Sequence, residues 1–118
     1  MLPNALQISP DQVIAELARH IGADSGIHVA ELVRRISGQP VSNALLERKV
    51  RQHITDLRLQ GHHICGHPAS GYYMAANGRE LDATCAYLRA RAMSSLVIIS
   101  KLQGVAMPEL MGQMSLAT

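Results

Sequence analysis

A narrow apolar stripe in residues 42–60 limits the possible folds of this chain more than any other feature. Its members recur at intervals of four, four and three, which is the spacing of one helical face; they are Leu46, Val50, Ile54 and Leu57. Gly61 follows the stripe, so we predict a helix from about Ser42 to Gln60. One stripe buries little surface alone, so this helix needs other elements packed against it.

Two shorter periodic segments precede this helix. A capping-box pattern at residues 9–12 predicts a helix over residues 10–21. A second helix is predicted over residues 29–36, and its inward residues are Val29, Leu32, Val33 and Ile36. We also expect a brief strand at residues 26–29 and a loose arm at residues 1–8.

Extended segments and a long helix follow. Residues 62–66 and 72–75 are short extended runs joined by the turn residues 67–71, which predicts a β-hairpin. Asn77 is a good helix N-cap, and the helix after it is predicted over residues 78–102. The tail beyond is expected to form a short turn or to be disordered. Three helices, a hairpin and a long helix predict a mainly α (α+β) fold, in the order of a winged helix-turn-helix.

The composition is that of a small globular protein. The chain has 118 residues, enough for one core, and 47% of them are apolar. Because Phe and Trp are absent, the core must be aliphatic. Cys65 and Cys85 lie far apart, the N-terminus lacks a signal-peptide pattern, and the longest unbroken apolar run covers only residues 96–99. We therefore expect a cytoplasmic protein without a disulfide framework.

The face of the 42–60 helix opposite the stripe is rich in cations and amides. At 3.6 residues per turn it contains Arg48, Gln52 and Thr55, with Lys49 and Arg51 beside them and Arg58 further along. Arg and Gln can each make two hydrogen bonds to a base edge, and Lys and Arg neutralise phosphates. A solvated surface helix has the same pattern, and the net charge of +2 only permits nucleic-acid binding. The position of the helix, before a hairpin, favours a recognition helix.

A specific combination of residues supports this interpretation. The helix end ITDLRLQG (54–61) leads to IC (64–65) and then to GYYMA (71–75). This combination resembles the recognition helix and wing of biotin-repressor-type winged helices, and is similar to small phage and prophage DNA-binding proteins. The resemblance covers residues 10–76, and the chain departs from it in a longer segment between Ile36 and Val50.

The resemblance implies the orientation of the hairpin side chains. Tyr72 and Met74 are expected to point into the core, and Tyr73 to be more exposed. His67 and Ser70 are expected near the wing tip, where such proteins touch phosphate or the minor groove. Double-stranded DNA is the partner that the resemblance implies.

The histidines and the cysteine in residues 62–67 suggest a zinc site only weakly. Zinc binds His nitrogen and Cys sulfur, but tetrahedral sites usually take separated ligand pairs. Cys65 as a nucleophile lacks an evident base and orienting group. We expect ordinary wing residues here, no metal, no cofactor and no enzymatic activity; a zinc-dependent activity stays a third possibility that metal analysis would test.

The predicted last helix carries a second apolar stripe, with heptad spacing. Its members are Leu81, Cys85, Leu88, Ala92, Ser95, Ile99 and Leu102, and Leu96 to Ile98 widen it. One small domain can hardly bury so much apolar surface, so we expect a homodimer through this helix. Its predicted dimerisation residues are Leu81, Cys85, Leu88, Ala92, Leu96, Ile99 and Leu102. The alternative is that the helix folds back on its own domain.

These predictions combine into one hypothesis. Residues 1–76 form a winged-helix domain with a short N-terminal arm, and residues 77–118 form the C-terminal helix and tail. The protein binds double-stranded DNA as a transcriptional regulator or phage-type accessory factor; the candidate contacts are Arg48, Lys49, Arg51, Gln52, Thr55, Arg58, His67 and Ser70. The alternative is a winged-helix protein–protein adaptor that does not bind DNA.

Overall fold

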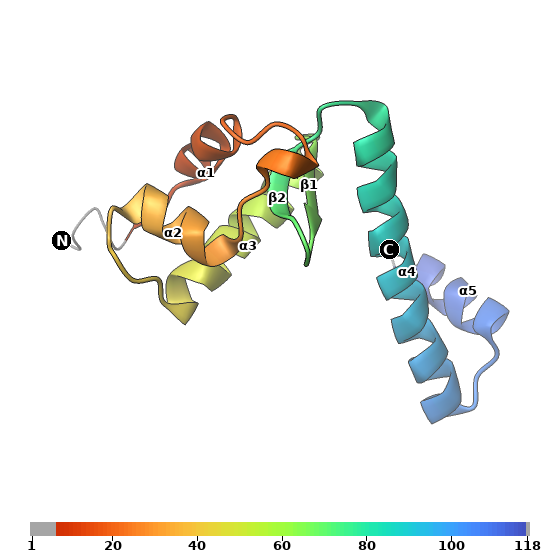
Figure 1. Cartoon of the computed structure of the whole chain (residues 1–118). Helices are drawn as coiled ribbons and strands as arrows, with labels where there is room; N and C mark the ends of the chain where they lie inside the picture. The colour runs from red at the N-terminus through yellow and green to blue at the C-terminus, as the bar shows by residue number, and fades with distance from the viewer. Residues whose placement is uncertain (1–6, 118) are drawn as a thin grey trace. The chain divides into compact units, whose positions relative to one another are not determined.

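The computed structural model describes residues 7–117, with side chains to residue 114. Within this range the protein is mainly helical with a small two-stranded antiparallel sheet, so its class is α+β (Figure 1). The helices are α1 (Pro10–Leu17), α2 (Val29–Ser37), α3 (Ala44–Leu59), α4 (Gly78–Gln103) and α5 (Met107–Ala117), and the strands are β1 (Ile64–His67) and β2 (Gly71–Met74). The chain divides into two compact units, one ending at Thr84 and one beginning at Cys85.

The core of the first unit is aliphatic. The predicted α3 stripe is buried along its whole length, and no member is more than 5% exposed. Side chains of α1 and α2 pack against it; they are Val13, Leu17, Leu32 and Val33, with Val29 and Ile36 partly buried. The predicted inward faces of α2 and α3 are therefore confirmed.

The helix N-termini are capped by the residue types that the sequence places there. In α1, Ser9 and Gln12 form the reciprocal capping box, each side chain accepting from the other's backbone N–H. Asn43 caps α3 by accepting a hydrogen bond from the backbone N–H three residues on, at 2.9 Å, and Asn77 does the same before α4. These bonds satisfy N–H groups that have no partner inside the helix.

The segment between α1 and α2 lies beside β2 and pairs with it at two isolated residues. Ile21 bridges Met74, and Ile27 exchanges two backbone hydrogen bonds with Tyr72, both of 2.8 Å. Because this segment pairs with β2, α1 ends before the predicted residue 21. The brief strand predicted at residues 26–29 is reduced to the bridge at Ile27.

The hairpin forms in the predicted place. Its register pairs Ile64 with Met74 at one end and His67 with Gly71 at the turn. Tyr72 and Met74 are partly buried against the core, as the resemblance implies.

The opposite face of the hairpin is also buried, so the expectation of an exposed Tyr73 is wrong. Tyr73 is 5% exposed, and Cys65, its partner across the strands, is fully buried. The first turns of α4 supply the cover: Thr84 Oγ1 accepts from Gly66 N–H at 3.3 Å, and Cys65 Sγ lies 3.6 Å from the Glu80 carbonyl oxygen. Burial raises the pKa of the Tyr73 phenol.

Glu80 fastens the start of α4 to the first unit. Its carboxylate accepts hydrogen bonds from the backbone N–H groups of Ala23 and Ala76, both of 2.9 Å. These two bonds, the one from Ala23 first, lower the pKa of the Glu80 carboxyl. The first turns of α4 thus belong to the first unit, and the unit boundary after Thr84 lies later than the boundary expected after residue 76.

The predicted N-terminal arm is only partly described. Residues 1–6 lie outside the described range. Ile8 is 5% exposed in the core, and its carbonyl oxygen lies 2.8 Å from His53 Nε2. The expectation of a loose arm is therefore wrong for Ile8, because α3 holds its backbone.

The second unit contains the rest of α4 and the helix α5, which turns back toward the middle of α4 (Figure 1). The tail forms the helix α5, so the short turn or disorder predicted from the sequence is not what the structure has. Leu96 of α4 and Leu110 of α5 are the buried side chains among residues 85–114. None of the helices described over residues 7–117 is both long enough and apolar enough to cross a membrane.

Candidate nucleic-acid interface

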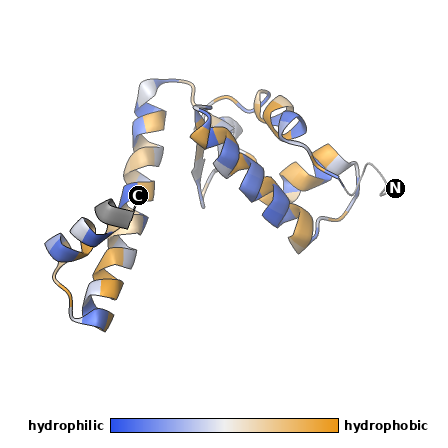
Figure 2. Ribbon diagram, turned by 180° about the vertical axis from the view of Figure 1, so that it is seen from behind, coloured by the Kyte–Doolittle hydropathy of each residue, from blue (hydrophilic) through white to orange (hydrophobic). Residues whose placement is uncertain are grey.

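The predicted polar face of α3 is exposed. Arg48, Lys49, Arg51, Gln52 and Thr55 all lie on the surface, while the stripe behind them is buried. Figure 2 views α3 from this side, where its ribbon is mainly hydrophilic. The long segment between α2 and α3 forms a loop at residues 38–43, and these five side chains remain exposed beside it.

Cations of α2 and α3 differ in how they are paired. On α2, Arg34 and Arg35 approach Glu31 at 2.9 and 3.3 Å, and their hydrogen bonds, that of Arg34 first, lower the pKa of the Glu31 carboxyl. Among the ion pairs of residues 7–117, none involves Arg48 or Lys49. A cation without a carboxylate partner can neutralise a phosphate without first giving up an ion pair.

The other polar side chains of α3 make local contacts. Arg51 lies 3.9 Å from Glu47, which is one turn away. Gln52 donates to Asp56 Oδ1 at 3.0 Å, and the Thr55 hydroxyl donates to the Arg51 carbonyl oxygen at 3.2 Å. Exposed pairs of this kind contribute only about 0–1 kcal/mol, so a bound duplex could replace them at small cost.

Arg58 is placed differently from the other predicted contacts. It is half-buried; its Nε donates to the Ile64 carbonyl oxygen at 2.8 Å, and its guanidinium carbon lies 5.9 Å from the centre of the Tyr72 ring. Both contacts join α3 to the hairpin, and the second is a cation–π interaction. The guanidinium therefore has a structural role, and its remaining N–H groups are the ones open to a phosphate.

The two predicted wing residues lie at the hairpin turn. His67 is exposed at the end of β1, and its Nδ1 accepts from the Ala69 backbone N–H at 3.1 Å. Ser70 is half-buried, and its hydroxyl donates to the Gly71 carbonyl oxygen at 3.1 Å. His67 is thus the better placed of the two to meet a ligand.

Two leucines belong to the α3 surface that the sequence analysis did not single out. Leu45 and Leu59 are 75% and 82% exposed. At 3.6 residues per turn they lie on the same side of α3 as Arg48 and Gln52. Extending the helical projection to both ends of α3 would have found them. Apolar side chains at such a surface can meet a thymine methyl group or a protein partner.

The histidines near Cys65 do not gather into a metal site. Within the described part of the chain, no three His, Cys, Asp or Glu side chains come close enough together to hold a metal ion. Cys65 is buried under α4, whereas His62, His63 and His67 are exposed.

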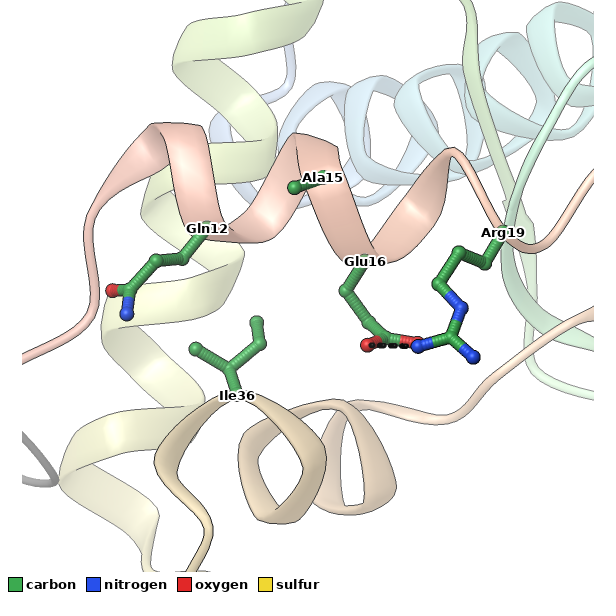
Figure 3. A pocket seen from close by; sticks show the side chains of 5 residues that line it. All are labelled: Gln12, Ala15, Glu16, Arg19 and Ile36. Carbon is green, nitrogen blue, oxygen red and sulfur yellow. Dashed lines mark ion pairs between the residues drawn. The ribbon is translucent and has the colours of Figure 1, made fainter.

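A groove of about 300 Å³ lies between α1 and α2 (Figure 3). Its polar lining is already bonded: Gln12 caps α1, and Glu16 pairs with Arg19 at 4.0 Å and with His20 at 2.8 Å. Ala15 and Ile36 complete the lining. These bonds indicate that the groove serves helix packing.

The predicted dimerisation residues fall into two groups. Leu96 is 8% exposed, and Leu81 is half-buried in the first unit. The others are exposed: Cys85, Leu88, Ala92, Ile99 and Leu102.

Comparisons with known proteins give no relative for this chain: no protein-family model, no curated protein and no solved structure matches it.

Proposed function

We propose that this protein binds double-stranded DNA sequence-specifically, as a winged helix-turn-helix. In this proposal α3 enters the major groove and the β1–β2 hairpin is the wing. The protein then acts as a transcriptional regulator or an accessory factor of the phage type. The observation that carries the proposal is the exposed polar face of α3, held outward by a fully buried stripe.

The side chains of this face have the chemistry that a duplex requires. Arg48 and Gln52 are suited to bidentate bonds with guanine and adenine, and Thr55 lies beside them. Lys49, Arg51 and the free N–H groups of Arg58 are assigned to phosphates, and His67 and Ser70 to the backbone beside the wing. The α2 arginines are ion-paired with Glu31, whereas Arg48 and Lys49 of α3 take part in none of the ion pairs of residues 7–117.

Salt dependence tests the phosphate contacts. Fluorescence anisotropy of labelled duplexes, selected from a random DNA pool, measures the binding constant at increasing salt. Each neutralised phosphate contributes a slope of about −0.9, so three phosphate-binding cations predict a slope of about −3 for each chain. Lys49→Ala should make the slope shallower by about 1. A binding constant independent of salt would contradict the proposal.

A double substitution tests base recognition. Arg48→Ala combined with Gln52→Ala should reduce discrimination between selected and scrambled duplexes by about 1–3 kcal/mol for each lost bidentate pair. The control is Arg19→Ala, which removes a 75% exposed side chain and one positive charge from the segment that follows α1. Unchanged discrimination in the double variant would show that another surface reads the sequence.

One observation favours a second candidate function, a protein–protein adaptor without DNA binding. Val41, Leu45 and Leu59, in or beside α3, are 72–82% exposed. An apolar partner surface would cover them, and that complex should change little between low and moderate salt. The anisotropy titration separates the two functions, because only DNA binding weakens steeply with salt.

A further inference from the structure

The second unit has far more exposed than buried apolar surface. Leu96 and Leu110 are buried, whereas eight large apolar side chains of the same unit are 36–80% exposed; they are Leu88, Met93, Val97, Ile98, Ile99, Leu102, Met111 and Met114. α4 is orange over much of its C-terminal half in Figure 2. Two buried side chains are too few to stabilise a pair of helices in water, so this unit needs an additional apolar contact.

The exposed residues of α4 include a continuous heptad stripe. At 3.6 residues per turn, Leu96 lies on one side of the helix, and Leu88, Ser95, Ile99 and Leu102 lie together on an adjacent side. All four are exposed. Within the second unit, therefore, the side of α4 that contains Leu96 is covered, whereas the heptad stripe remains exposed to solvent.

Large and small side chains are arranged along the stripe so that it is complementary to a second, antiparallel copy of itself. Leu88 and Ile99 are large, and the residues between them on the stripe, Ala92 and Ser95, are small. When a copy runs in the opposite direction, Leu88 meets Ile99 and Ala92 meets Ser95. These are the layers of an antiparallel coiled coil, and the small central residues allow close approach.

The exposed apolar area around the stripe is modest. Four large aliphatic side chains lie on the stripe or directly beside it, and they are 36–80% exposed; they are Leu88, Ile98, Ile99 and Leu102. At about half exposure each, they supply on the order of 200 Å² of apolar surface. A standard interface buries roughly 800 Å² on each partner, somewhat more than half of it apolar, so the stripe supplies about half of that apolar area and favours a dimer that dissociates readily.

From these observations we infer that the second unit binds a second copy of this chain through the heptad stripe of α4, residues 88–102. The stripe belongs to α4 and not to α3, and its test uses no DNA. Failure of this inference and failure of the DNA-binding proposal are therefore distinguishable.

The test is the mass of the full-length protein in solution. Sedimentation equilibrium over about 1–100 μM protein should give twice the chain mass of 12.8 kDa at the upper concentrations. Leu102→Glu places a charge in the apolar contact and should raise the dimer dissociation constant by about 100-fold or more. Leu88→Glu should act in the same direction.

The control is Leu59→Glu. Leu59 is 82% exposed in the last turn of α3, and Leu102 is 80% exposed in the last turn of α4, so the two substitutions make the same change in matched surroundings. Circular dichroism checks that each variant is folded. Leu59→Glu should leave the dimer intact. A wild-type protein that stays monomeric, a dimer that survives both α4 substitutions, or a dimer equally weakened by Leu59→Glu would each overturn the inference.

Discussion

Replacing Gly71 by alanine should detach the hairpin from the segment that precedes α2. Gly71 has a φ of +78°, and a Cβ atom there would lie 2.5 Å from the carbonyl carbon and oxygen of Ile27. No real contact is so short, so the two backbones must separate. The separation disrupts the two hydrogen bonds, both of 2.8 Å, that Ile27 exchanges with Tyr72.

The expected loss of stability follows from two contributions. An alanine in the left-handed region costs about 1–2 kcal/mol. Each of the two hydrogen bonds between Ile27 and Tyr72 contributes about 0.5–1.5 kcal/mol. Gly71→Ala should therefore lower the free energy of unfolding by about 2–5 kcal/mol, a large part of the total stability of a small domain.

Gly38→Ala is the matched control. Gly38 has nearly the same φ, +73°, but no atom lies within 4 Å of the position that its Cβ would take. It should cost only the conformational contribution of about 1–2 kcal/mol. Urea unfolding followed by circular dichroism measures both variants. If Gly71→Ala cost no more than Gly38→Ala, the close approach of the hairpin to Ile27 would be refuted.

Two further predictions concern the core and the start of α4. Leu32→Ala, at a fully buried position, should lower the free energy of unfolding in urea by about 2–5 kcal/mol, whereas Leu45→Ala, at a 75% exposed position, should change it by less than about 0.5 kcal/mol; equal effects would contradict the placement of the core. The second prediction concerns pH, because the pKa of Glu80 in the folded protein is lower than its ordinary value of 4.5. Its contribution to stability is fully present above the unfolded pKa and is lost as the pH falls through the folded pKa. The stability difference between wild type and Glu80→Gln, measured by urea unfolding from neutral to acidic pH, should therefore shrink as the pH falls; a constant difference would contradict the two backbone hydrogen bonds to the Glu80 carboxylate.

Features that depend on a few neighbouring residues can be predicted from the amino-acid sequence by itself. The stripe of α3 is buried as its spacing predicts, because apolar residues three and four apart must share one face of a helix. Ser9 and Asn77 cap helices because a short polar side chain can reach the free N–H groups of the first turn. The exposed face of α3 follows from the same geometry, so five of the predicted contact residues are on the surface.

Features that depend on contacts between distant parts of the chain are decided by the tertiary structure. Alternation places Tyr72 and Tyr73 on opposite faces of the hairpin, but it contains no information about the first turns of α4, which bury Tyr73. Likewise, the early end of α1 depends on pairing with β2, and the burial of Ile8 on its packing near His53. A periodic pattern assigns a residue to a face of its own helix or strand. Which segment covers that face depends on how the whole chain packs. The hydrophobic effect is non-directional, so an apolar face can be buried equally well by a segment that is near or distant in the sequence.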